Sequence, residues 1–112
     1  MIDLTKIGQQ AQKSAHELGL LSTKDKNNLL LQMADAIERN TEMILVANEQ
    51  DLEAARLQKT TPTLLDRLTL THARILEMAN GMREVAQLPD PIGRVDQMWR
   101  NADDLLIGQQ RV

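Results

Sequence analysis

Apolar residues recur at steps of three and four along most of the chain, and this period constrains the fold more than any other feature. Such spacing places side chains on one face of an α-helix. The stripes consist of Leu4, Ile7, Ala11, Ala15 and Leu18; Leu30, Met33, Ala34 and Ile37; Ile44, Ala47, Leu52 and Ala55; Leu64, Leu65 and Leu68; and Ile75, Met78, Ala79, Met82 and Val85. The sequence therefore predicts helices over residues 4–18, 23–39, 42–57, 62–68 and 72–87.

Helix-end signals agree with these limits. Gly19 is expected as a left-handed C-cap, because glycine adopts positive φ without steric cost. Ser22 and Thr71 are expected N-caps, and the pair Asn40-Thr41 should break one helix and cap the next. Pro62 suits the first turn of the short helix. Each predicted helix thus has a start or stop signal of its own.

One aromatic residue, Trp99, and no cysteine are present among the 112 residues. A core must therefore come from Leu, Ile, Val, Met and Ala, which suits packed helices. The methionines Met33, Met78 and Met82 are expected to fill that core, and Gly81 could allow close helix packing. The absence of cysteine excludes disulfides, thiolate metal sites and a cysteine nucleophile within these residues.

Charge and hydropathy exclude two further classes of function. The net charge is −3 and no basic cluster stands out, so no nucleic-acid partner is expected. No apolar run approaches the ~20 residues of a membrane span, and the first residues lack a secretory pattern. A cytoplasmic location is the default expectation.

After Gly93 the period changes from that of a helix to that of a strand. Val95, Gln97 and Trp99 would share one strand face, with Arg94, Asp96 and Met98 on the other. A turn should occupy residues 101–104, and a second strand should cover residues 105–112. The fold class predicted is mainly α, with amphipathic helices followed by a C-terminal pair of short strands. Trp99 would be buried either against a partner or against the chain's own helices.

Residues with catalytic potential do not gather into a recognisable motif. The five glycines are scattered, so no dinucleotide or phosphate-loop pattern exists. His16 and His72, with Glu17 and Glu77 nearby in sequence, are expected on the surface, and Ser14 would face away from His16. The acids Asp90, Asp103 and Asp104 are expected to be solvated loop residues. The sequence thus assigns no catalytic, cofactor-binding or metal-binding residue to this chain.

Three segments carry a family resemblance. The first is Ala47-Asn48-Glu49-Gln50-Asp51-Leu52 with Ala54-Ala55-Arg56, and the second is Leu64-Leu65-Asp66-Arg67-Leu68-Thr69-Leu70-Thr71. The third is Gly81-Met82-Arg83-Glu84-Val85-Ala86-Gln87-Leu88-Pro89-Asp90-Pro91-Ile92-Gly93. In order and spacing they resemble elements near the start of glutamate-5-semialdehyde dehydrogenases (gamma-glutamyl phosphate reductases), and the remainder aligns from Met1 to Val112. One departure is Arg100–Asp104, where the family often has glycines.

The resemblance implies a reductase of the aldehyde dehydrogenase superfamily. Such an enzyme uses NADPH and a downstream cysteine thiolate to convert L-glutamate 5-phosphate to L-glutamate 5-semialdehyde in proline biosynthesis. Residues 1–93 would be the helical N-terminal part of the cofactor domain, and residues 94–112 would begin the oligomerisation arm, two strands of a larger α/β fold. No catalytic position of the family falls within this chain, so the segment alone is expected to be inactive.

Partners follow from the same reasoning. The abrupt end after the second predicted strand suggests that the remainder of a reductase chain is the main partner. Exposed apolar stripes and free strand edges also predict self-association of the isolated segment. An independent helical interaction module, binding through its Met and Leu stripes, is the alternative.

Overall fold

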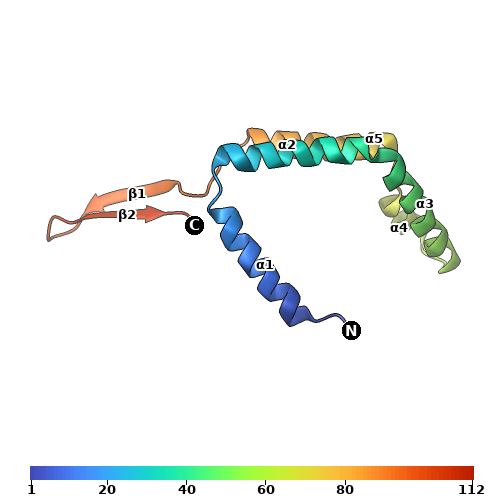
Figure 1. Ribbon diagram of the computed structural model, residues 1–112, viewed down its shortest axis with the longest axis horizontal. Coiled ribbons are helices and arrows are strands. Elements are labelled where there is room, and N and C mark those ends of the chain that lie inside the picture. The colour runs from blue at the N-terminus through green and yellow to red at the C-terminus, as the bar shows by residue number, and fades with distance from the viewer. The chain divides into compact units, whose positions relative to one another are not determined.

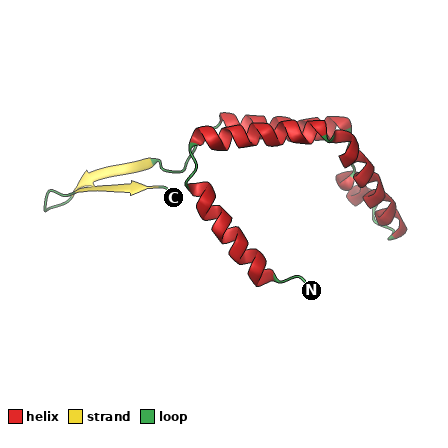
Figure 2. Ribbon diagram, viewed as in Figure 1, coloured by secondary structure: helices red, strands yellow, loops and turns green.

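The computed structural model describes all 112 residues and contains five helices and one β-hairpin, drawn in Figure 1 and coloured by type in Figure 2. The elements are α1 (Leu4–Gly19), α2 (Thr23–Arg39), α3 (Thr41–Leu57), α4 (Pro62–Leu68), α5 (His72–Gln87), β1 (Val95–Arg100) and β2 (Leu106–Gln110). They form two compact units. One comprises residues 1–26 with 88–112, and the other comprises residues 27–87. The prediction of a mainly helical chain with a C-terminal strand pair is confirmed.

Side-chain caps account for most of the helix starts. The backbone N–H of Asp25 donates to the Ser22 hydroxyl at 3.1 Å, and that of Arg74 donates to the Thr71 hydroxyl at 3.2 Å. These bonds satisfy amide groups that have no partner in the first helical turn. Pro62 lies in the first turn of α4. The predicted caps at Ser22 and Thr71 are therefore confirmed.

The predicted left-handed end at Gly19 is wrong, whereas the predicted break at Asn40 is confirmed but lacks a side-chain capping bond to α3. Gly19 is the last helical residue of α1, and the helix ends through Leu20 at φ −88°, without a left-handed residue. Asn40 is the only residue between α2 and α3, and its side chain donates to the Ala36 carbonyl at 2.7 Å instead of capping α3. The α2 C-terminus thus takes the side chain that sequence reasoning gave to the α3 N-terminus. The helix α3 begins at Thr41, one residue earlier than predicted.

The only left-handed helix end is that of α3, and it lacks a glycine. Lys59 has φ 57°. Its N–H donates to the Arg56 carbonyl at 3.0 Å, and the N–H of Thr60 donates to the Ala55 carbonyl at 3.1 Å. This pair of bonds defines a Schellman motif, in which glycine is the usual left-handed residue. Lysine therefore occupies a strained position there.

The buried core belongs to the unit of residues 27–87. It consists of four side chains from α2, α3 and α5, namely Ala34, Leu52, Ile75 and Ala79. The predicted core role of two methionines is wrong, because Met33 is 50% exposed and Met78 is 43% exposed. Close packing at Gly81 is also absent, since a Cβ there would meet no atom within 4 Å. The core is small because the helices turn only part of each predicted stripe inward.

The helix α1, in the other unit, has no buried residue. Leu4, Ile7 and Leu18 of its predicted stripe are each at least half exposed. The chain as a whole exposes 9393 Å² at a mass of 12.6 kDa. A compact monomer of that mass exposes about 6,200 Å², and two separate compact bodies of half that mass expose about 7,500 Å² together. Much of the apolar surface that the sequence patterns provide is therefore uncovered.

Strands β1 and β2 pair with each other in antiparallel fashion, and no third strand joins them. Trp99 faces Ile107 and Met98 faces Gly108. The register shifts between Val95 and Gln97, so Asp96 forms a bulge and the predicted simple alternation fails at that point. Trp99 is 46% exposed, so burial against the chain's own helices is not what the structure shows.

The hairpin turn closes without glycine. The Asn101 side chain accepts hydrogen bonds from the N–H groups of Asp103 at 3.0 Å and Leu105 at 2.9 Å. Asp104 adopts φ 59°, a conformation that Asp and Asn tolerate better than most residues. Residues 101–104 are therefore the turn that the sequence predicts, and the second strand is shorter than predicted.

Candidate functional site

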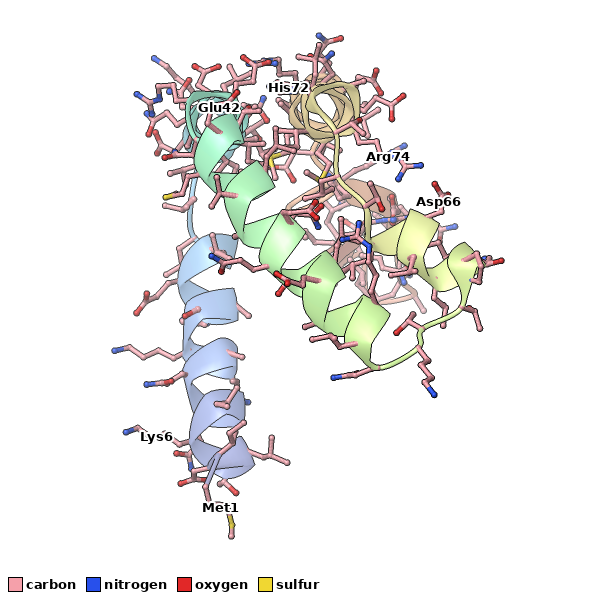
Figure 3. The ribbon with its side chains drawn as sticks, turned by 90° about the vertical axis from the view of Figure 1, so that its right-hand side faces the viewer. Met1, Lys6, Glu42, Asp66, His72 and Arg74 are labelled. Carbon is pink, nitrogen blue, oxygen red and sulfur yellow. The ribbon has the colours of Figure 1, made fainter.

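The two histidines singled out from the sequence belong to different units, and each is exposed. No group of three or more His, Cys, Asp or Glu side chains could hold a metal ion. His16 is exposed on α1, and neighbouring Glu17 pairs with Lys13 at 3.9 Å. His72 pairs with Glu42 at 2.8 Å, and Figure 3 shows both side chains at the surface.

Of the remaining candidates, two have structural roles and two are exposed. The Ser22 hydroxyl caps α2, and Ser14 is exposed on α1. Asp104 accepts a hydrogen bond from Arg100 at 3.4 Å within the hairpin turn, and Asp103 is exposed.

No helix is long and apolar enough to cross a lipid bilayer.

The first recognised segment contributes one buried polar residue, Asn48 of α3, which is only 7% exposed. Its amide nitrogen donates to the Leu68 carbonyl at 2.9 Å, and its amide oxygen accepts from the Leu70 N–H at 2.8 Å. The side chain therefore pairs with the backbone between α4 and α5 as a neighbouring strand would. We call this pair of bonds the Asn48 clamp.

The second segment is tied down by Arg74 of α5, close to Asp66 of α4 in Figure 3. Its guanidinium donates to the carbonyls of Asp66 and Thr69, both at 2.6 Å. It also donates to the Asp66 carboxylate at 3.1 Å. Arg74 thus adds side-chain hydrogen bonds to the carbonyls at the C-terminal end of α4, where the Asp66 carbonyl also accepts from the Thr69 N–H at 3.2 Å. The Asn48 clamp and Arg74 together hold the α4–α5 connection.

The third segment contributes Arg83, which joins α5 to α2. Its guanidinium donates to Glu38 and to Asp35, each at 2.8 Å. The hydrogen bond from Arg83, assisted by its charge, holds the pKa of the Glu38 carboxyl below its usual value. The two carboxylates in turn raise the pKa of Arg83. The side chain is fully engaged in holding two helices side by side.

The same segment ends in a loop organised by Asp90. Its carboxylate accepts from the Lys26 ammonium, from the Thr23 hydroxyl at 2.9 Å and from the Ile92 N–H at 3.0 Å. These contacts lower the pKa of Asp90 to about 2, and the hydrogen bond from Lys26 has the largest effect. The expectation of a solvated loop acid is wrong, because only 15% of this side chain is exposed. We call this group the Asp90 clasp.

The recognised segments thus build a scaffold, and the contacts within it were missed from the sequence. One signal was available. Ile44, Asn48 and Leu52 follow one another at intervals of four residues, which puts Asn48 on the inward face of α3. The structure buries Asn48 and exposes Ala47, the residue that the predicted stripe included. A polar residue on an inward helix face must find hydrogen-bond partners.

Sequence relatives cover the chain almost completely. It is 56% identical over 110 residues to a gamma-glutamyl phosphate reductase of Enterococcus faecalis. The matched stretch covers 98% of this chain and 26% of that relative. The chain is 48% identical over 112 residues to the enzyme of the same name from Lactiplantibacillus plantarum, with coverage of 100% and 26%. No protein-family model matches the chain. By these coverages, the chain spans about a quarter of the length of the two curated relatives.

Solved structures agree. The gamma-glutamyl phosphate reductase of Thermotoga maritima superimposes with a TM-score of 0.89 and 31% identity, over 96% of this chain and 26% of that one. The enzyme of the same name from Saccharomyces cerevisiae gives 0.87 and 29%, over 96% of this chain and 28% of that one. The chain is thus homologous to gamma-glutamyl phosphate reductases and corresponds to their N-terminal segment.

Proposed function

We propose that the chain is the N-terminal helical segment of an NADPH-dependent reductase that converts L-glutamate 5-phosphate to L-glutamate 5-semialdehyde. The observation that carries this proposal is the match along nearly the whole chain, in sequence and in fold, to enzymes of that name. The reaction would belong to proline biosynthesis, the enzyme to the aldehyde dehydrogenase superfamily, and its location would be the cytoplasm. The matches above are all to reductases, and none favours an independent interaction module.

The segment would serve the enzyme as a scaffold and would be inactive alone. It has no cysteine to act as the nucleophile that thioester chemistry needs. Two of its cationic side chains, Arg74 and Arg83, are engaged by carboxylates and carbonyls, which supports a cofactor site elsewhere in the enzyme. The segment also lacks a glycine-rich loop at a helix start. The cofactor and the reactive thiol would therefore be held by the rest of the enzyme.

The exposed apolar surfaces of α1 and the hairpin support a scaffold role that depends on the rest of the enzyme. Residues 1–93 would pack on the cofactor domain, which would cover the apolar stripe of α1. Residues 94–112 would begin the oligomerisation arm, where both faces of the hairpin, including Trp99 and Met98, need neighbours. The same surfaces would make the isolated segment self-associate, so sedimentation should show dimers or larger species, and a monomer at all concentrations would contradict this.

The test is to express the complete reading frame that contains the chain and to assay the reverse reaction. L-Glutamate 5-semialdehyde, phosphate and NADP⁺ should yield NADPH, followed at 340 nm, and omission of phosphate should abolish the signal. The 112-residue chain should give none, and neither should the whole protein with its downstream nucleophilic cysteine changed to alanine. A well-folded whole protein without phosphate-dependent NADPH formation would overturn the proposal, and so would a reading frame that stops at Val112.

A further inference from the structure

The Asp90 clasp joins two parts of one unit that are far apart in sequence. Through Oδ2 the carboxylate accepts from Lys26 and Thr23, both in the first turn of α2. Through Oδ1 it accepts from the Ile92 N–H, two residues further along its own loop. One side chain therefore fixes the loop between α5 and β1 onto the start of a helix.

This loop is in turn bound to the base of the hairpin. The N–H of Gly93 donates to the Arg111 carbonyl at 2.9 Å, and the N–H of Arg111 donates to the Arg94 carbonyl at 2.9 Å. The Gln110 side chain donates to the Gly93 carbonyl at 2.9 Å. Gly93 has φ 83°, which a residue with a side chain rarely adopts. Contacts thus run without a break from α2 through Asp90 to both strands.

The clasp differs from the other ion pairs in its burial. The side chains of Lys26 and Asp90 are 23% and 15% exposed, compared with 28% and 38% for Arg83 and Glu38 and 71% and 83% for His72 and Glu42. Ion pairs that are shielded from water are less screened than exposed ones. The loop is also stiffened locally, because Pro89 and Pro91 flank Asp90 and restrict its backbone. A short, stiff connection held at one point suits a positioning role.

We propose that Asp90 is a positioning residue that sets the direction of the β1–β2 hairpin relative to the start of α2. With the carboxylate released, the hairpin keeps its own ladder but turns as one body about the segment of residues 88–91. The four core side chains all lie in the unit of residues 27–87, so this release is local and leaves the helical core intact. The inference rests on the chain's own contacts and holds whether or not the proposed activity is correct.

The experiment compares the chain with its Asp90→Asn variant by amide hydrogen exchange. Asparagine keeps the shape and an acceptor for Ile92 but removes the charge that holds Lys26. Exchange at Gly93 and Arg111 should become at least about tenfold faster, while exchange at Leu70 in the other unit should change less than twofold. The matched control is Asp66→Asn, which removes an exposed ion pair with Arg74 and should leave Gly93 and Arg111 unchanged.

A distance measurement separates positioning from general stabilisation. The chain has no native cysteine, so spin labels at Lys24→Cys and Ala102→Cys mark the start of α2 and the tip of the hairpin. Labelled chain is mixed with excess unlabelled chain, so that distances within one molecule dominate even if the chain self-associates. The parent should give one narrow distance distribution, and Asp90→Asn should broaden it. An unchanged distribution, equal acceleration at Leu70, or a parent whose Arg111 amide is unprotected would each overturn the proposal.

Discussion

Replacing Asn48 by alanine should be among the most damaging single changes in the helical unit. The substitution removes two hydrogen bonds, to the Leu68 carbonyl and from the Leu70 N–H. Leaving a buried polar group without its partner costs about 1–3 kcal/mol. Because both backbone groups are only partly buried, we expect a combined loss in the free energy of unfolding of about 2–4 kcal/mol. Domains of ordinary stability have only about 5–15 kcal/mol in total.

The assay is urea unfolding followed by circular dichroism at 222 nm, with exchange at the Leu70 amide as the local readout. Gln50→Ala is the matched control, because Gln50 is an exposed residue of the same helix. That control should change stability by less than about 0.5 kcal/mol. A loss below about 0.5 kcal/mol in Asn48→Ala, with Leu70 still protected, would refute the account of the clamp.

Asn48→Asp tests the polarity of the clamp. The ionised carboxylate can accept from Leu70 but would face the Leu68 carbonyl without a proton to donate. Burial and that carbonyl should raise the folded-state pKa of Asp at this position above its unfolded value. The folded state then binds more protons, so stability falls as pH rises through this range and recovers as pH falls. A variant whose stability loss is the same at pH 4 and pH 7 would contradict the assigned bonds.

Three further substitutions or conditions test other parts of the structure. Gly81→Ala should stabilise the chain by about 1 kcal/mol in urea unfolding, because nothing lies near the added Cβ and alanine favours the helix; destabilisation would show that the site is tighter than described. Lys59→Gly should add about 0.5–1 kcal/mol by relieving the left-handed strain after α3, and a loss of thermal stability would argue against the Schellman geometry. The pKa of Asp90 is lowered to about 2, so the clasp should be fully formed above about pH 4 and should open as the pH falls from 4 to 2. Hydrogen exchange at Arg111 should follow that titration, and protection that does not change over this range would speak against the clasp.

Much of the fold was predictable because it is encoded locally. The apolar period, Pro62 and the hydroxyls of Ser22 and Thr71 place helix limits close to those observed. Prediction failed at two helix ends, in the side-chain cap at Asn40 and the left-handed end at Gly19. Asn40 serves the end of α2, and Gly19 remains helical because nothing after it requires a left-handed turn. Such outcomes depend on neighbouring elements that a local pattern does not contain.

The scaffold contacts show the same limit. The resemblance identified the segments around Asn48, Asp66 and Asp90, but residue spacing does not reveal a partner that is distant in the chain. Asp90 meets Thr23 at a separation of 67 residues, and Asn48 meets Leu70 at a separation of 22. The assignment of no catalytic, cofactor-binding or metal-binding residue within this chain remains a prediction.

The central claim is that this chain can serve as the N-terminal segment of a gamma-glutamyl phosphate reductase, and a chimera tests it most directly. The matching quarter of the Enterococcus faecalis enzyme would be replaced by residues 1–112, and phosphate-dependent NADPH formation would be measured beside the parent enzyme and a version that lacks the segment. We predict that the chimera retains activity within about tenfold of the parent, as expected if interface changes cost no more than about 1.4 kcal/mol, while the truncated enzyme is inactive. A chimera that folds and assembles like the parent but forms no NADPH would contradict the claim.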